Sequence, residues 1–333
     1  MRKAEPVVDT HAHYVPEAYL RIIETEGAPF GIGINRSNPK APAIEIHGVI
    51  GGPLRSAFWD LDLRRKEMDR QGVQMHALSL SHPMATWGDG AVGLRVARVV
   101  NDALVEAHRA FPDRFTGFAT LPLQDPKRAL EELERVQRLP GIRGVYMGTN
   151  VLGRELADKE LWPVWERIEQ LKLPVFLHPI DPVGKERMRP FYFHNLLGFP
   201  FDTTLAAAHL VFAGVLERYR KLTVGLAHAG GTFPYLIGRL DRGRAVRPEC
   251  RDLPRRPSAY LRRFFYDTIG HAPATIRYLA DLVGIDRLLL GSDYCFDMGY
   301  ERPVEVVTAV PGLSRADRRR ILWDNAAKPL RLA

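Results

Sequence analysis

Two histidines one residue apart, His11 and His13, stand near the start of the chain in the stretch VVDTHAHYVP. Residues i and i+2 of an extended strand project to the same side, so both imidazoles can point at one position. Two further histidines and an aspartate end short apolar runs, namely His178 in FLHP, His228 in GLAHAGG and Asp293 in LLLGSDY. Imidazole and carboxylate are ligands of catalytic zinc, and imidazole also exchanges protons near neutral pH. A fold that gathers the five residues would therefore create a metal centre with an acid or base beside it.

Eight short apolar runs, rich in valine, isoleucine and leucine, are candidates for the strands of such a fold. Continuous apolar runs are typical of strands buried on both faces of a parallel sheet, and amphipathic stretches separate most of them. We therefore expect an α/β fold of the (β/α)8 TIM-type barrel class. The runs cover residues 6–10, 73–80, 115–121, 142–148, 173–179, 222–228, 264–269 and 287–293.

The barrel is expected to be a single domain over residues 1–333. Such barrels typically need about 250 residues. The Gly- and Pro-rich residues at about 14–58 explain part of the surplus as a small insertion after the first strand. The alternative is an open doubly wound sheet, but no glycine-rich phosphate loop follows the first strand.

In a barrel of this class the carboxyl ends of all strands open on one face, where the active site lies. His11 and His13 belong to the first strand end, and His178 and Asp293 to the fifth and eighth. These four residues are predicted to bind one Zn²⁺ ion, with Mn²⁺, Fe²⁺ or Co²⁺ as alternatives. His228, at the end of the sixth strand, is predicted to exchange protons beside the metal-bound water.

Composition limits the class of protein further. The chain has 333 residues, of which 46% are hydrophobic, and only two cysteines, which excludes a disulfide framework. Without a secretory signal or a membrane-spanning apolar run, we expect a cytoplasmic protein with no membrane partner. The formal net charge of +8 fits a small anionic carboxylate substrate. The densest basic stretch, residues 239–263, is broken by acids and prolines and has almost no aromatic residues, so no nucleic-acid partner is expected.

The motifs VVDTHAHYVP, FLHP, GLAHAGG and LLLGSDY together resemble the metal-dependent amidohydrolase superfamily. Longer stretches resemble its decarboxylase branch, typified by 2-amino-3-carboxymuconate 6-semialdehyde decarboxylase, and they are AFWDLDLRRKEMDRQGV, AHAGGTFPYLIGRLD, RRPSAYLRRFFYD and GSDYCF. The resemblance implies a non-oxidative carboxy-lyase for an unsaturated or aromatic carboxylic acid. It also implies that His228 is the general acid or base next to one zinc ion.

The resemblance implies substrate-binding residues as well. Arg55, in GGPLRSAFWD, falls where the branch places an arginine on a substrate carboxylate. Arg239, in LIGRLD, falls on a second such arginine, which reaches the site of the neighbouring subunit, so a homodimer is implied. Phe296, in SDYCF, would line the substrate ring.

The chain departs from the wider superfamily in two places. The fourth strand, IRGVYMGTN, lacks the lysine that bridges two metals in many hydrolases, so one ion per chain is expected. Where relatives carry a tryptophan after the fifth strand, this chain reads RMRPFYFHN, and Phe191, Tyr192 or Phe193 would replace that ring.

Two other functions remain as alternatives. A metal-dependent hydrolase or hydratase, acting on a lactone, amide or ester, would use the same ligands with His228 as a base. A non-catalytic binding protein would agree with the positive charge, but it would leave the five converging residues without a role.

Overall fold

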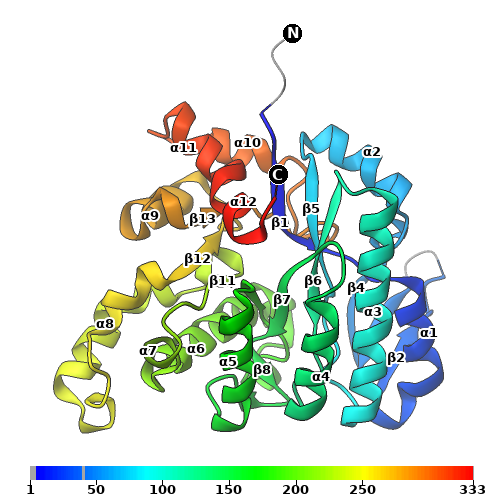
Figure 1. The fold of residues 1–333 in the computed structure, drawn as a ribbon, viewed down its shortest axis with the longest axis horizontal. Coiled ribbons are helices and arrows are strands. Elements are labelled where there is room, and N and C mark those ends of the chain that lie inside the picture. Colours follow the sequence, from blue (N-terminus) through cyan, green and yellow to red (C-terminus); the bar gives the residue numbers. More distant parts are fainter. Residues whose placement is uncertain (1–4, 40–41, 333) are drawn as a thin grey trace. The chain divides into compact units, whose positions relative to one another are not determined.

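The computed structural model describes residues 5–39 and 42–332. Eight parallel strands form a nearly closed barrel with helices between them, in the order β1-β5-β6-β7-β10-β11-β12-β13 (Figure 1). The predicted (β/α)8 class is therefore confirmed. The strands are β1 (Val8–His13), β5 (Met75–Ser79), β6 (Phe115–Thr120), β7 (Ile142–Gly148), β10 (Val175–His178), β11 (Val224–Leu226), β12 (Phe264–Asp267) and β13 (Leu288–Leu289).

The helices alternate with these strands along most of the chain. None of them, in the described part of the chain, combines the length and the apolar character that a membrane crossing needs. They are α1 (Glu17–Glu26), α2 (Leu61–Gln71), α3 (Gly90–Ala110), α4 (Pro126–Val136), α5 (Trp162–Leu171), α6 (Phe199–Phe212), α7 (Val215–Arg218), α8 (Phe233–Val246), α9 (Pro273–Val283), α10 (Pro303–Thr308), α11 (Arg315–Arg319) and α12 (Asn325–Leu330).

The chain divides into two compact units, residues 1–143 with 291–305 and residues 144–290 with 306–333. In the first unit, β1, β5 and β6 pair in parallel. Figure 1 shows α3 lying along β6 and next to α4. The long helix α3 starts at Asp89, whose carboxylate accepts hydrogen bonds from the amides of Ala91 and Val92. This cap satisfies amides that the first helical turn leaves without a partner.

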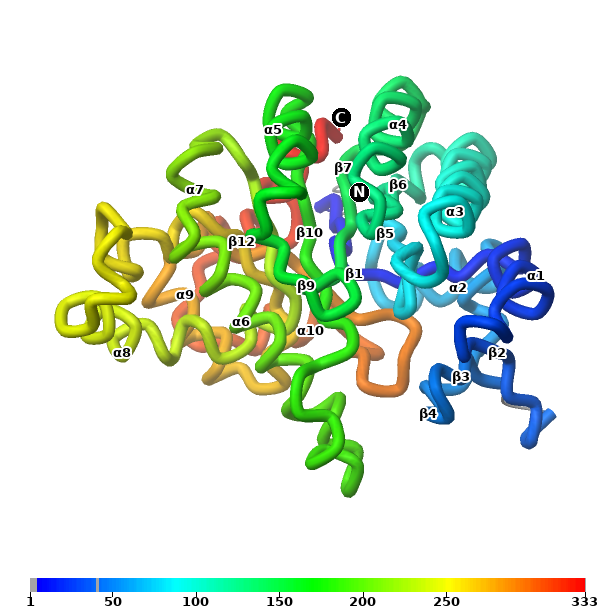
Figure 2. Tube along the Cα trace, turned by 90° about the horizontal axis from the view of Figure 1, so that it is seen from below, coloured from blue at the N-terminus to red at the C-terminus, as the bar shows by residue number. Residues whose placement is uncertain are grey.

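The residues between β1 and α2 form a small substructure of their own. It contains α1 and a three-stranded antiparallel sheet, which lies next to α1 in Figure 2. These elements fall within the predicted insertion, and the interpretation of the whole chain as one domain stays a prediction. The sheet comprises β2 (Ile32–Asn35), β3 (Ala43–Ile46) and β4 (Val49–Pro53).

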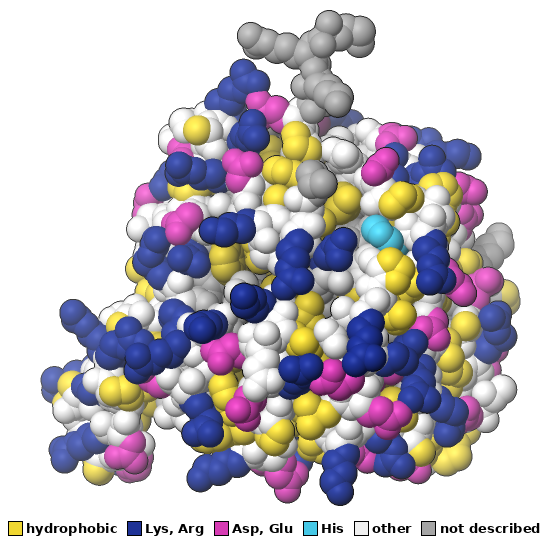
Figure 3. All heavy atoms as spheres, in the orientation of Figure 1, with side chains coloured by type: hydrophobic (Ala, Val, Ile, Leu, Met, Phe, Trp, Pro, Cys, Tyr) yellow, Lys and Arg dark blue, Asp and Glu magenta, His cyan; other side chains and the backbone are white. Residues whose placement is uncertain are grey.

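In the second unit, β10, β11, β12 and β13 pair in parallel, and a short ribbon of β8 (Asn150–Val151) and β9 (Arg154–Glu155) follows β7. The segment between β10 and α6, residues 181–198, extends beyond α6 in Figure 2. Figure 3 shows many Lys and Arg side chains in the region where Figure 1 draws α8. That helix contributes Arg239, Arg242 and Arg244.

One strand differs clearly from its prediction. The apolar run predicted a strand over residues 287–293, whereas β13 covers only Leu288–Leu289. The reason lies in the polar residues that follow. The backbone amide of Ser292 donates a hydrogen bond to the Asp9 carboxylate at 3.1 Å, and the Ser292 hydroxyl donates to the same carboxylate. The Asp9 side chain therefore accepts the N–H group that Ser292 would donate to a neighbouring strand if β13 continued.

Candidate metal centre

His11 and His13 point to the same side of β1, as predicted. Both side chains are completely buried, and their Nε2 atoms lie 3.1 Å apart. The pairing of β1 with β5 shifts register between Asp9 and Ala12, so the strand is irregular where it carries the ligands. The lone pairs of two neutral imidazole nitrogens repel each other at this separation. The arrangement is therefore stable only if a cation or a proton lies between the two nitrogens.

Asp293 joins the pair from a position 280 residues further along the chain. One carboxylate oxygen, Oδ1, lies 2.9 Å from His13 Nε2 and 3.4 Å from His11 Nε2. The backbone of Asp293 is left-handed, with φ of 62°, and its amide donates to the carbonyl of His11 at 2.9 Å. Ala12 and Tyr294 form a parallel bridge beside it, so backbone pairing fixes Asp293 against β1.

Asp9 forms hydrogen bonds with the backbone of both segments that carry these residues. It is fully buried, and its Oδ1 accepts hydrogen bonds from the amides of His11 at 2.9 Å and Ser292 at 3.1 Å. Burial raises the pKa of Asp9 to about 6, although the hydrogen bonds from Ser292 and His11 oppose that rise. The carboxyl group thus links the strand that carries two ligands to the turn that carries Asp293. Sequence reasoning missed this role, since it read VVDT only as part of a strand.

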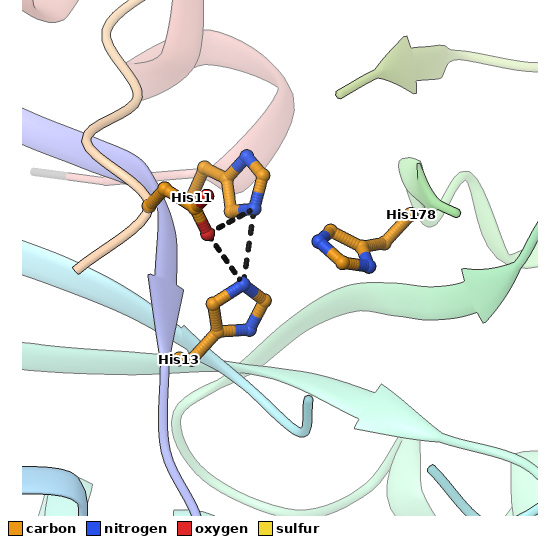
Figure 4. A group of neighbouring side chains, drawn as sticks. His11, His13 and His178 are labelled. Carbon is orange, nitrogen blue, oxygen red and sulfur yellow. Dashed lines mark hydrogen bonds and ion pairs between the residues drawn. The ribbon is translucent and has the colours of Figure 1, made fainter. Parts of the chain in front are cut away.

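His178, the last residue of β10, completes the group. The ligand atoms of His11, His13, His178 and Asp293 all lie within 4.8 Å of one another, and all four residues are buried. Figure 4 shows the three histidine rings. Ligand atoms that share one divalent ion at about 2.0–2.2 Å lie about 2.8–3.6 Å apart, and the separations among His11, His13 and Asp293 fall in this range. Three histidines and one aspartate therefore fit a single metal ion.

The end of β7 carries polar residues in place of the lysine of two-metal hydrolases. The amide of Thr149 donates to the carbonyl of His178 at 3.0 Å, and the Thr149 hydroxyl donates to Asp202. Asn150 also donates to Asp202, at 3.2 Å. Burial raises the pKa of Asp202 to about 6, against the lowering effect of these hydrogen bonds. Asp202 and Thr149 thus support the backbone of a predicted ligand, and no motif or spacing in the sequence indicates this pair.

His228 follows β11 on a tight turn within the second unit. Its ring centroid lies 5.3 Å from that of His178, which agrees with the prediction that the two residues end neighbouring strands. His228 and Ala229 both have left-handed backbones, with φ of 53° and 56°. A Cβ atom on Gly231, which follows in the same turn, would lie 1.9 Å from the carbonyl oxygen of Pro200, so only glycine fits there.

Phe296 lies next to a predicted metal ligand, and its contact with a substrate ring stays a prediction. Its ring is packed against His13, with 5.2 Å between centroids, and against Phe58, with 4.9 Å. Arg55 is exposed, and its Nη2 lies 3.6 Å from Glu67 Oε1. Burial raises the pKa of the Cys295 thiol to about 11, while the charge of Arg55 is among the effects that lower it. Arg55 is therefore electrostatically close to the segment that carries Phe296.

The remaining predicted residues lie on the surface of the second unit. Arg239 is exposed on α8, and within the described residues its side chain makes no hydrogen bond or ion pair. Phe191 is 80% exposed and lies 5.4 Å from Phe193 between ring centroids. The aromatic rings of Tyr146, at 5.7 Å, and Phe199, at 6.2 Å, lie beside His178, and the sequence analysis did not single out either of them.

Comparisons with known proteins identify the family. Residues 8–332 match the family model described as amidohydrolase. The chain is 31% identical over 328 residues to 2-amino-3-carboxymuconate-6-semialdehyde decarboxylase of Dictyostelium discoideum, covering 98% of this chain and 91% of that protein.

Two solved structures are also similar. The apo form of IDCase from Metarhizium anisopliae has a TM-score of 0.89 and 27% identity, covering 98% of this chain and 97% of the other. A dihydroxybenzoic acid decarboxylase from Polaromonas, with bound manganese and the inhibitor 2-nitroresorcinol, has a TM-score of 0.80 and 26% identity, covering 98% and 97%. The chain therefore belongs to the amidohydrolase family, in the branch of 2-amino-3-carboxymuconate-6-semialdehyde decarboxylase-like proteins.

Proposed function

We propose that this protein is a metal-dependent, non-oxidative decarboxylase of an unsaturated or aromatic carboxylic acid. The observation that carries the proposal is the buried group of His11, His13, His178 and Asp293, with a further histidine, His228, next to His178. The relatives support the reaction type, since those named above are decarboxylases of a carboxymuconate semialdehyde and of a dihydroxybenzoic acid.

The four ligands would hold one ion, which we propose is zinc, with manganese, iron or cobalt as alternatives. The bound manganese of the Polaromonas structure supports a divalent ion in a site of this kind. When bound, the ion would act as a Lewis acid towards oxygen substituents of the substrate.

The chain's own residues would carry the proton and orient the acid. His228 would deliver a proton to the carbon that bears the leaving carboxylate. The bond between that carbon and the carboxylate then breaks, its electron pair returns to the conjugated system, and CO2 leaves. Arg55 would bind a substrate carboxylate as a bidentate donor, and Phe296 would line the ring.

We also propose a homodimer in which Arg239 of each chain reaches the site of the other. Its exposed position on α8, without a partner among the described residues, leaves the guanidinium available for such a contact. The two cysteines, Cys250 and Cys295, are both free thiols, which supports a cytoplasmic location.

A direct assay tests the reaction type. Purified protein loaded with Zn²⁺ or Mn²⁺ is incubated with carboxymuconate, hydroxybenzoate and related acids, and CO2 release is measured. We expect CO2 from at least one acid and none from the His228→Ala protein beyond about 1% of that rate. Acid production from lactones, amides or esters without CO2 release would instead assign the protein to the hydrolases.

A further inference from the structure

Arg64, in α2, is an arginine whose side chain is completely buried in the first unit. Its guanidinium donates to two backbone carbonyls, that of Ala57, at 3.1 Å from Nε and 2.9 Å from Nη2, and that of the predicted ligand His13. A planar guanidinium directs its donors along fixed directions, so these bonds define where the carbonyl of His13 lies.

The same guanidinium also contacts the turn that carries Asp293. Its central carbon lies 4.7 Å from the ring centroid of Tyr294, the residue directly after Asp293. The hydroxyl of Tyr294 donates to Glu67, which lies on the same helix as Arg64. Tyr294 is therefore fixed to α2 through both its ring face and its hydroxyl.

A third contact leads to Asp9. Nη1 of Arg64 lies 3.3 Å from Nδ1 of His76, a fully buried histidine of β5. Burial, together with the charges of Arg64 and Arg114, holds the pKa of His76 well below its usual range, so Nδ1 of the neutral ring accepts from Arg64. The other nitrogen, Nε2, lies 3.8 Å from Asp9 Oδ2. Asp9 in turn accepts the amide of His11.

Within the described residues, no carboxylate oxygen lies within 4.0 Å of the Arg64 guanidinium, which is unusual for a buried arginine. Its bonds are made to carbonyls, to an imidazole and to an aromatic face instead. Apart from the carbonyl of Ala57, these groups belong to, or contact, the segments that carry His11, His13 and Asp293.

We propose that Arg64 is a positioning residue of the metal centre, and that its buried guanidinium holds β1 and the turn after β13 in the arrangement that brings His11, His13 and Asp293 together. This inference rests on the proposed metal-binding function. It assigns Arg64 no contact with the substrate or the ion.

Binding of Co²⁺ to the metal-free protein, followed by calorimetry and by the visible spectrum of the bound ion, tests the inference without an activity assay. For Arg64→Ala we expect about 10–100-fold weaker binding and a changed spectrum, since groups that orient metal ligands commonly have effects of this size. Added guanidinium ion should restore part of the affinity. Arg64→Lys, which keeps the charge but loses the planar fork, should remain weakened by about 10-fold.

The neighbouring Arg65 provides a matched control. Its guanidinium lies 4.1 Å from the ring centroid of Phe111 and contacts Asp62, away from the ligands, so Arg65→Ala should bind Co²⁺ within about twofold of the wild type. A folded Arg64→Ala protein that also binds within about twofold would overturn the inference.

If Arg64→Ala does not fold, the Tyr294→Leu protein provides the test, because it loses the contact between the Arg64 guanidinium and the Tyr294 ring while Arg64 remains. A loss of affinity of about 3–10-fold supports the inference and unchanged affinity overturns it. Wild-type protein that binds no Co²⁺ would overturn the proposed metal centre together with this inference. Wild-type protein that binds Co²⁺ but releases no CO2 would overturn only the proposed reaction.

Discussion

The carboxylate of Asp267 accepts a hydrogen bond from the backbone amide of His228, at 3.0 Å from Oδ2. Its Oδ1 accepts the amide of Ala229 at 2.8 Å and that of Ile269 at 3.0 Å. Asp267 is the fully buried last residue of β12, and it therefore fixes a left-handed turn that is unfavourable for residues other than glycine. Asp267 thus holds the backbone from which the His228 side chain extends.

Replacing Asp267 by asparagine should test that role. An amide nitrogen in place of one oxygen would face a backbone N–H group, so the turn loses an acceptor. We expect turnover to fall about 10–100-fold and stability to fall by about 1–3 kcal/mol, with metal content unchanged. The control is Asp286→Asn, since Asp286 pairs with Arg262 on the surface. Wild-type turnover in Asp267→Asn would show that His228 is oriented by other contacts.

His228→Gln keeps a polar side chain of similar size but cannot exchange protons near neutral pH. If His228 is the acid, steady-state turnover should fall about 10²–10⁴-fold. Metal content, measured by elemental analysis, should not change, because His228 is not among the four predicted ligands. A variant that keeps more than about a tenth of the turnover would rule out this role.

Removal of the metal should abolish activity and be reversible. Dialysis against a chelator should leave a folded, inactive protein that recovers with Zn²⁺ or Mn²⁺. Asp293→Asn removes the negative charge of the ligand group and should retain less than about a tenth of the wild-type metal after gel filtration. An active protein without a divalent ion would contradict the proposed mechanism.

The raised pKa of Asp202 leads us to expect that the stability of the protein depends on pH. This pKa is raised to about 6 in the folded protein, so the folded state binds more protons than the unfolded state between pH 3.8 and about 6. The stabilising contribution of Asp202 is present below this window and is lost as the pH rises through it, by up to about 3 kcal/mol. Denaturant titrations of wild type and Asp202→Asn at pH 4, 5, 6 and 7 check the expectation.

In the asparagine variant the difference in unfolding free energy from wild type should change across that window and be constant above about pH 7. Burial also raises the pKa of Asp9. Both proteins contain Asp9, so its contribution cancels in the difference between their unfolding free energies. A difference that does not vary with pH would show that Asp202 titrates normally.

Complementation between two inactive variants tests the placement of Arg239. Mixed dimers of His228→Ala and Arg239→Ala contain one complete site only if each arginine serves the partner's site. We expect about a quarter of wild-type activity after random exchange of subunits, since half of the dimers are mixed and each has one active site. No recovery, with exchange verified by mass spectrometry, would place Arg239 outside the partner's site.

The sequence was sufficient to predict the barrel class and the four buried side chains that the structure brings together, whose role as metal ligands stays a prediction. The i, i+2 spacing of His11 and His13 fixes their common direction, and His178 closes an apolar run that the structure confirms as a strand. These features depend on local periodicity and on a general rule of barrel topology.

The residues that bond the backbone around the predicted ligands and around His228 were not predictable in the same way. Asp9, Arg64 and Asp267 act through backbone groups of segments distant in sequence, and no spacing rule connects a side chain with such a partner. The predicted length of β13 was wrong for the same reason. The Asp9 carboxylate accepts a hydrogen bond from the backbone amide of Ser292, which ends the strand early. Which of Phe191, Tyr192 and Phe193 replaces the tryptophan of the relatives stays a prediction, and the rings next to His178 are those of Tyr146 and Phe199.

The separation of 280 positions between His13 and Asp293 has a consequence for how the protein is made. During synthesis on the ribosome, β1 emerges early with two histidines that lack their carboxylate partner. Only after nearly the whole polypeptide has been released can Asp293 reach them. Binding of the proposed ion would therefore come late in the synthesis of each molecule, and a chain that terminates before Asp293 would lack one of the four predicted ligands.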